Sequence, residues 1–189
     1  MKKIIAIIAA ILFLPGCMPA VFVAGAAAGG AVIYDHRSTK DILDDRNITF
    51  QVQNKLDHDM RLRQHAHVSI ATFNHVALLL GQAPNNELRN HAEAIVKANP
   101  KIKILYNEIT IGKPIANMAR ANDAWITTKV KTVLLATPGL SSTNLKIVTE
   151  NGVVYLMGLT TRTQAKLAAA KTRKVAGVRK VVKLFEYLN

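Results

Sequence analysis

Hydrophobic residues recur at helical spacing between Asn122 and Thr137, and this pattern predicts the helix around which the chain is organised. Asn122 or Asp123 precedes the apolar pattern and is available as the N-cap. One face of the helix is apolar and is expected to pack on a core. That face consists of Ile126, Val130, Val133 and Leu134. The residues expected to point elsewhere are Trp125, Thr128, Lys129, Thr132 and Leu135, with Lys131 at the margin.

Trp125 is the chain's only tryptophan, and it is expected off the core face, beside Lys129. An indole ring is amphipathic and lysine ammonium groups are attracted to phosphate. The pattern is therefore typical of a surface that contacts the headgroup layer of an anionic membrane. The alternative is that Trp125 packs under a neighbouring loop or domain, and the pattern alone does not separate the two.

The helical pattern occurs twice, which indicates an internal repeat. An offset of 78 residues relates Ile48, Val52 and Leu56 to Ile126, Val130 and Leu134. The strands expected in the first copy are 67–71, 76–81 and 102–111, and those in the second are 145–148, 153–158 and 178–188. A second helix is expected over 86–98 and over 162–175, and hairpin turns at 74–75 and at Asn151-Gly152.

These elements predict an α+β fold with two tandem domains, over residues 45–113 and 114–189. Each domain is expected to be a small mixed β-sheet covered by two helices. In both copies a glycine, Gly81 or Gly158, closes the second strand, where we expect a positive φ or a close approach of two backbones.

The first 17 residues have the features of an export signal. Lys2 and Lys3 precede an apolar run that is short for a membrane span, and Leu14-Pro15-Gly16-Cys17 follows it. This arrangement resembles a bacterial lipobox, in which Cys17 is acylated and becomes the first residue of the mature protein. Met18 rather than aspartate follows the cysteine, which for such lipoproteins implies the outer membrane, facing the periplasm. The alternatives are an ordinary secretory signal and a plain anchor helix.

Residues 18–44 change character and are interpreted as a tether. The part up to Ile33 is rich in Ala, Gly and Val, and a polar stretch follows it. A second transmembrane helix is the alternative, but the small-residue stretch is short and interrupted by glycine.

The chain is strongly basic, with 25 Lys+Arg against 12 Asp+Glu. Removal of Lys2 and Lys3 with the signal leaves 23 − 12 = +11 for the mature form. Such a charge normally suggests nucleic acid. An exported, lipidated protein does not meet nucleic acid in the periplasm, so anionic lipid is the better candidate. Surface lysine that only keeps the protein soluble remains the alternative.

The repeat resembles the BON domain, a module of periplasmic and membrane-associated bacterial proteins. A lipobox followed by two such domains resembles the DolP (YraP) family of outer-membrane lipoproteins. The matching motifs are Tyr106-Asn107-Glu108-Ile109, the run from Asn122 to Val130, and Thr149-Glu150-Asn151-Gly152 before Leu156-Met157-Gly158-Leu159.

The resemblance implies a non-enzymatic protein that binds anionic phospholipid, notably phosphatidylglycerol, through the first helix of the second domain. Carried over by motif, the contacts are Trp125, Thr128, Lys129, Thr132 and Leu135, with Lys131 supplying charge nearby. The first copy has Asn47 and Gln51 at the positions of Trp125 and Lys129, so only the second copy is expected to carry the lipid face. The family is linked to envelope integrity, division sites and the outer-membrane protein assembly machinery.

Other chemistry finds little support in the sequence. His65 and His67 are two apart near a strand start, but no further ligand pattern accompanies them, and we expect neither a metal site nor a cofactor. The chain has no Gly-x-Ser-x-Gly motif and no cysteine besides Cys17, so no enzyme is expected. The rival functions are an adaptor for the outer-membrane assembly machinery and a peptidoglycan-binding spacer.

Overall fold

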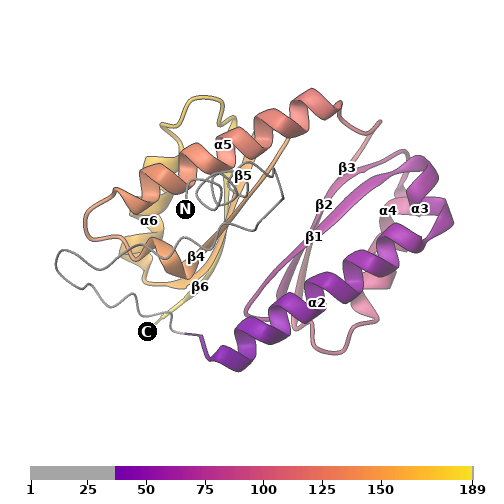
Figure 1. The fold of residues 1–189 in the computed structure, drawn as a ribbon, viewed down its shortest axis with the longest axis horizontal. Helices are drawn as coiled ribbons and strands as arrows, with labels where there is room; N and C mark the ends of the chain where they lie inside the picture. The colour runs from indigo at the N-terminus through magenta and orange to yellow at the C-terminus, as the bar shows by residue number, and fades with distance from the viewer. Residues whose placement is uncertain (1–36, 189) are drawn as a thin grey trace, which may run out of the picture. The chain divides into compact units, whose positions relative to one another are not determined.

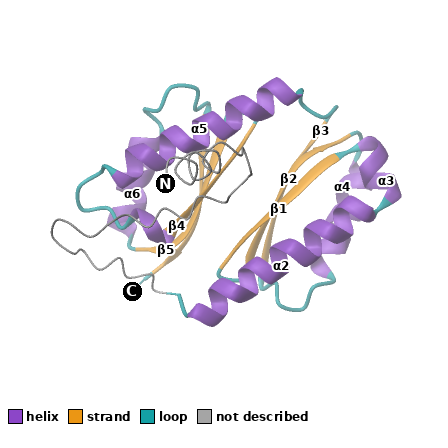
Figure 2. Ribbon diagram, in the orientation of Figure 1, coloured by secondary structure: helices purple, strands orange, loops and turns teal. Residues whose placement is uncertain are grey.

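The computed structural model describes residues 37–188, and these form two successive copies of one α+β unit (Figures 1 and 2). The first copy contains α2 (Thr39–His58), α3 (Met60–His65), β1 (His67–Phe73), β2 (Val76–Ala83), α4 (Asn86–Lys97) and β3 (Ile104–Ile111). The second contains α5 (Asn117–Leu135), a 3-10 turn η2 (Ser142–Asn144), β4 (Leu145–Glu150), β5 (Val153–Thr160), α6 (Arg162–Thr172) and β6 (Lys180–Tyr187). The signal segment, Cys17 and most of the expected tether lie outside the described residues.

Each copy has a three-stranded mixed sheet, as the repeat predicts. The orders are β1-β2-β3 and β4-β5-β6. The first two strands form an antiparallel hairpin, and the third joins the second in parallel after a helix. Parallel neighbours need such a crossover, which explains why α4 and α6 lie between the second and third strands.

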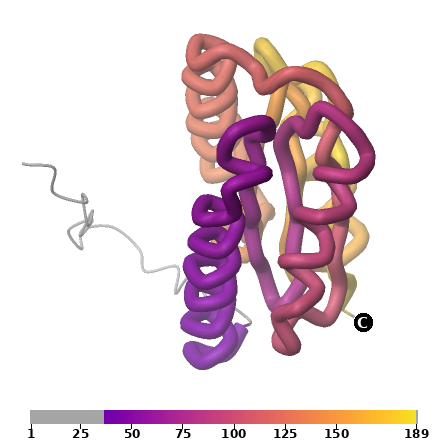
Figure 3. Tube along the Cα trace, turned by 90° about the vertical axis from the view of Figure 1, so that its right-hand side faces the viewer, coloured from indigo at the N-terminus to yellow at the C-terminus, as the bar shows by residue number. Residues whose placement is uncertain are grey.

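The helices of each copy cover one face of its sheet. In the first copy Ile48, Val52 and Leu56 of α2 pack with Leu79 and with residues of α4. Figure 3 shows α2 as a separate layer alongside its strands. In the second copy Ile126, Val130 and Leu134 of α5 form the corresponding core with Leu156 and with residues of α6. The expected core stripe of the central helix is therefore confirmed at these three positions.

The opposite faces of the two sheets share a third apolar cluster. The described residues from both copies belong to one compact unit. Leu78 and Leu80 of β2 cluster with Tyr155 and Met157 of β5. Because successive strand residues point to opposite faces, β2 is buried along its whole length, with Leu79 in the helix-covered core and Leu80 in the shared one.

Polar contacts accompany the shared cluster. Lys146 Nζ donates to the Thr72 carbonyl oxygen at 3.0 Å, and Gln82 Nε2 donates to Glu150 Oε1 at 2.6 Å. Burial and the neighbouring Glu108 raise the pKa of the Tyr155 phenol above its ordinary value. The two copies are therefore joined by polar groups as well as by hydrophobic packing.

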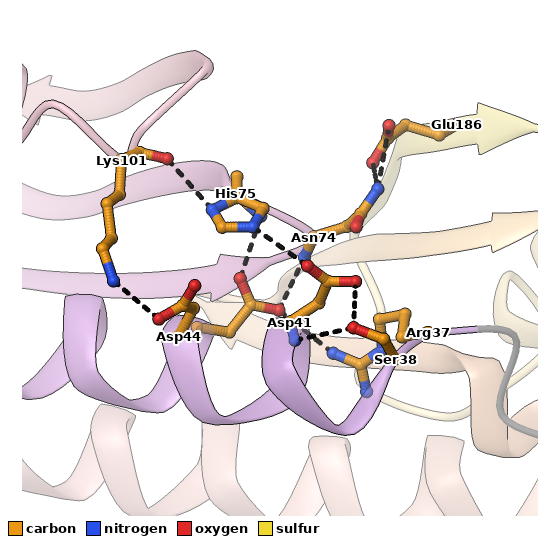
Figure 4. A network of polar contacts seen from close by, with 9 residues as sticks. Arg37, Ser38, Asp41, Asp44, Asn74, His75, Lys101 and Glu186 are labelled. Carbon is orange, nitrogen blue, oxygen red and sulfur yellow. Dashed lines mark hydrogen bonds and ion pairs between the residues drawn. The ribbon is translucent and has the colours of Figure 1, made fainter.

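A buried aspartate fixes each hairpin turn to the helix beneath it. Asp45 accepts hydrogen bonds from the backbone N–H groups of Asn74 and His75, and Asp123 does the same for the second turn. Figure 4 shows how the first turn is held further: the His75 ring lies between Asp41 and the Lys101 carbonyl. The backbone of both turns has positive φ, which explains the Asn-His and Asn-Gly pairs there.

Both strand glycines lie where two backbones approach closely, as expected. A Cβ on Gly81 would be 1.9 Å from the His67 carbonyl oxygen, and one on Gly158 would be 2.6 Å from that of Asn144. Gly81 also has a φ of +120°. Both lie within their strands, however, and do not end them.

The structure corrects four details. The central helix begins at Asn117, and its N-cap is Ala116 rather than Asn122 or Asp123. Asp123 lies inside the helix, where its carboxylate accepts a hydrogen bond from the hairpin turn at Asn151. Val133 is 36% exposed and lies off the core face. The first helix begins at Thr39, so residues 39–44 are not tether. The short helix α3 had no counterpart in the sequence interpretation.

Candidate functional site

A groove of about 610 Å³ runs between α5 and the end of α6, and we call it the α5–α6 groove. It brings together four of the expected site residues with a basic segment from elsewhere in the chain. It is lined by Trp125, Thr128, Lys129, Thr132, Val133, Lys171, Lys174, Val175 and Ala176.

The core face of α5 determines which residues reach this groove. Ile126, Val130 and Leu134 are completely buried and fix the rotation of the helix. Trp125 precedes the first of them and is therefore turned outward, with 60% of its surface exposed. The Trp125 ring is therefore not packed under a neighbouring loop of the described residues, which was the alternative.

Lys129 connects the two walls of the groove. Its Nζ donates to the carbonyl oxygen of Ala176 at 2.7 Å and lies 5.9 Å from the centre of the Trp125 ring. The cation is thus placed beside the indole, within the range of a cation–π contact. The same hydrogen bond ties α5 to the loop after α6.

The two threonines of the groove are already satisfied within the helix. Thr128 Oγ1 donates to the Ala124 carbonyl, and Thr132 Oγ1 donates to the Thr128 carbonyl. Such back-bonding uses the hydroxyl hydrogen and leaves each side chain poorly suited to donate to a ligand. Their contribution is shape and a small apolar surface.

Sequence reasoning missed the opposite wall, which comes from the end of α6. Lys171 and Lys174 are exposed, and Val175 is buried at the base of the groove. The available signal was the basic run Lys171-Thr172-Arg173-Lys174, but nothing in the sequence places it opposite a helix about 45 residues earlier. The groove therefore has three lysines, Lys129, Lys171 and Lys174, and the sequence indicated only the first of them.

The remaining two expected site residues lie outside this groove. Lys131 lines a different groove, on the other side of α5. Leu135 is 64% exposed at the end of the helix but is not part of the groove wall. The six positions therefore share a helix without sharing one surface.

The electrostatics of the groove are one-sided. Its described lining contains three lysines and no carboxylate, so it presents positive charge around an apolar base. The described residues contain no group of three or more His, Cys, Asp and Glu side chains that could hold a metal ion. Within the same residues, no helix has the length and apolar character needed to cross a membrane. Such an arrangement suits binding to an anionic, partly apolar ligand.

The equivalent face of the first copy differs, as the sequence predicts. Asn47 and Gln51 replace Trp125 and Lys129, and both are exposed on α2. This face thus lacks the pairing of an indole with an ammonium group.

Comparison with known proteins identifies both copies. The model of the BON domain matches residues 44–113 and 122–189. The first range begins inside α2 and the second inside α5, and each runs through the third strand of its sheet.

Two relatives match over most of their length. "Outer membrane lipoprotein DolP" of Haemophilus influenzae is 34% identical over 189 residues, covering 100% of this chain and 97% of the relative. "21 kDa hemolysin" of Actinobacillus pleuropneumoniae is 35% identical over 155 residues, or 82% of this chain and 80% of the relative. Among solved structures, the C-terminal domain of CdsD of the Chlamydia trachomatis type III secretion system covers 77% of this chain and 67% of its own. Its identity is 13% and its TM-score 0.31, so it supports no argument. The full-length match and the two BON domains show that this chain belongs to the DolP family of BON-domain proteins.

Proposed function

We propose that this protein is an outer-membrane lipoprotein, anchored through acylated Cys17 and facing the periplasm, that binds anionic phospholipid through the α5–α6 groove. Phosphatidylglycerol is the proposed lipid and support of envelope integrity the proposed role. The observation that carries the proposal is the groove itself, which combines an exposed indole with Lys129, Lys171 and Lys174 and lacks a carboxylate among its described lining.

The energetics fit reversible docking. Each lysine near an anionic surface contributes about 1 kcal/mol, and the indole adds interfacial contact. The acyl anchor keeps the groove close to the leaflet, so a weak site acts at high local concentration. The attraction depends on exposed charge, and salt should therefore weaken it.

Tryptophan fluorescence tests the proposal directly, because Trp125 is the only tryptophan in the chain. Vesicles that contain phosphatidylglycerol should shift its emission to shorter wavelength, and phosphatidylcholine vesicles should not. In a chain with Cys17→Ser, which has no acyl anchor, Trp125→Glu should abolish co-flotation with the anionic vesicles while the far-ultraviolet circular dichroism stays unchanged.

Met60→Glu is a matched control, because Met60 is 71% exposed and lies on α3, away from the groove. It should bind as the unaltered protein does. Lys171→Glu and Lys174→Glu together should weaken binding by at least about 30-fold, since two lysines that each contribute about 1 kcal/mol are reversed. Unchanged Trp125 emission in anionic vesicles, or equal loss of binding in Met60→Glu, would refute the proposal.

A second candidate function is an adaptor for the outer-membrane protein assembly machinery or the division site. The observation that favours it is that α5 exposes a large apolar side chain at each of its ends, Met118 (84% exposed) and Leu135 (64%). An exposed helix can occupy a groove on a partner protein. A photocrosslinker at position 125 separates the two functions, because lipid adducts support docking to the membrane and protein adducts support the adaptor.

A further inference from the structure

A second groove, of about 660 Å³, lies on the other side of α5, and we call it the α2–β4 groove. Its walls come from both copies, with α2 and β1 of the first and α5, η2 and β4 of the second. The proposed lipid-docking groove shares no lining residue with it. Its lining includes the basic residues Arg37, Arg46, Lys131 and Lys146 and the apolar residues Ile42, Phe50, Phe73 and Ile147.

Three cations converge near the base of this groove. Lys146 is held there by its hydrogen bond to the Thr72 carbonyl. Burial lowers the pKa of its ammonium group, and although Asp45 opposes this shift, Arg37 and Lys131 lower the pKa further. Arg37 and Lys131 are therefore each close enough to repel the ammonium group of Lys146, and all three line the groove. Because Arg37 is paired with Asp45, an anion placed beside Lys131 and Lys146 would relieve the remaining repulsion.

The described lining contains one carboxylate, and its hydrogen-bonding capacity is already used. Asp45 accepts from Arg37 Nη1 at 3.1 Å and from the backbone N–H groups of Asn74 and His75 at 2.6 and 2.9 Å. Asp45 thus holds the turn and one arginine. Arg46 lies on the exposed side of α2 and adds a further positive charge to the wall.

The rest of the lining combines apolar side chains with the neutral polar side chains of Thr49, Gln53, Thr72 and Thr143. Phe50 is 69% exposed, although it is a large aromatic residue in the middle of α2. Phe73, Ile147 and the partly exposed Ile42 continue this apolar surface. A single-ligand site has a volume of about 300–1,000 Å³, is mostly apolar, and has a few placed polar groups, and the groove has these properties.

We propose that the α2–β4 groove binds one molecule of a single-chain amphiphile with a phosphate headgroup, such as a lysophospholipid. The phosphate lies against Lys131 and Lys146, and the alkyl chain covers Phe50 and Ile147. This site takes a lipid monomer, whereas the α5–α6 groove faces a bilayer surface. The charge of the groove selects the phosphate, and its exposed aromatic surface selects the chain.

The experiment uses the full-length chain with Cys17→Ser, which prevents acylation, and isoleucine methyl labelling for NMR. Ile42 and Ile147 line the α2–β4 groove. Ile126 belongs to the buried face of α5, and its side chain lies near Gly177, next to the α5–α6 groove residue Ala176, so it reports on the other groove. Dodecyl phosphate below its micelle concentration should shift the Ile42 and Ile147 methyl signals saturably and leave that of Ile126 in place.

The probes and variants separate the contribution of the phosphate headgroup from that of the alkyl chain. Inorganic phosphate and neutral dodecyl maltoside should each cause less than a tenth of the shift. Arg46→Glu with Lys131→Glu, two exposed helix positions, should weaken dodecyl phosphate binding at least tenfold. Lys171→Glu with Lys174→Glu makes the same charge change on the α5–α6 groove and should leave dodecyl phosphate binding unchanged.

Four results would overturn the inference. Shifts at Ile126 alone would place the amphiphile in the other groove. Equal shifts with inorganic phosphate would reduce the site to a simple anion site, and equal shifts with dodecyl maltoside would make the contact independent of charge. Undiminished binding in the double variant would exclude the cations from recognition. The result in vesicles for Trp125→Glu tests the proposed docking function separately.

Discussion

An aspartate that accepts two backbone hydrogen bonds occurs three times among the described residues. Asp45 and Asp123 hold the two hairpin turns. Asp59 caps α3 by accepting from the N–H groups of Arg61 and Leu62. A charged acceptor makes a stronger hydrogen bond than a neutral one, so each of these carboxylates fixes backbone that has no ladder partner.

Asp59 should make stability depend on pH. Its Oδ2 lies 2.7 Å from His91 Nε2, and this hydrogen bond is the main cause that holds the Asp59 pKa below its ordinary value near 3.8. A carboxyl whose pKa is lower in the folded state contributes stability above its unfolded value and loses it as pH falls through the folded value. Asp59→Asn keeps a capping side chain but removes the charge, and should cost about 1 kcal/mol at pH 7.

Urea unfolding between pH 7 and pH 2 checks this expectation. The difference between the unaltered protein and Asp59→Asn should shrink as pH falls below the ordinary Asp pKa near 3.8, and should vanish only below the lowered folded pKa, where Asp59 is neutral in both the folded and the unfolded state. Asp57→Asn is the control, because Asp57 is an exposed carboxyl only two residues away, in the last turn of α2. A difference that stays constant across the whole range would contradict the account.

At the scale of elements, the hairpins depend on a strand position that tolerates no side chain. The N-terminal end of β1 passes over Gly81 of β2, where a Cβ would overlap the His67 carbonyl oxygen. Gly158 meets the start of β4 in the same way. In each copy the strand register therefore requires a glycine at this position.

Gly81→Ala should destabilise the protein by about 3 kcal/mol, from overlap with the backbone together with an unfavourable φ. Gly139→Ala provides the matched control. Gly139 also has a positive φ, +76°, but a Cβ there meets nothing within 4 Å, so the cost should be about 1 kcal/mol. Chemical denaturation of the two variants measures the difference, and equal losses would show that φ alone matters.

Most of the fold could be predicted from the sequence because the same pattern of residues occurs in both copies. The apolar spacing, the turn residues and the two strand glycines each occur at matching positions, and consistent local signals of this kind specify one structure. The helix start was wrong because Asp123 has its partners at Asn151 and Gly152, which local capping rules do not consider. The groove wall at Lys171 and Lys174 was missed for the same reason, since it depends on which helix ends meet in space.

At the scale of the whole described molecule, the two sheets stabilise each other. Leu78 and Leu80 of the first copy and Tyr155 and Met157 of the second belong to one cluster. The central strands are therefore buried on both faces, which is the arrangement that favours continuous hydrophobic runs over alternation. The run Val76-Ala77-Leu78-Leu79-Leu80 has this character.

Two neighbouring leucines allow the helix-covered core of the first copy and the shared cluster to be tested separately. Leu79 and Leu80 are both almost fully buried, but Leu79 packs under the helices of its own copy and Leu80 in the shared cluster. Each change to alanine should cost about 2–5 kcal/mol. Only Leu80→Ala should also accelerate amide hydrogen exchange in β5, because it loosens the surface that both copies use. Equal exchange in β5 of the two variants would argue against coupling through this cluster.

The shared cluster also bears on how such a chain arises. A single unit with this sheet would expose one apolar sheet face to water. Association with an identical chain is the simplest way to bury that face. Two units on one polypeptide make this association intramolecular, so the burial of the apolar face no longer depends on protein concentration. The outward helices take no part in covering this cluster, so their exposed faces are free to differ, with Trp125 on one and Asn47 on the other.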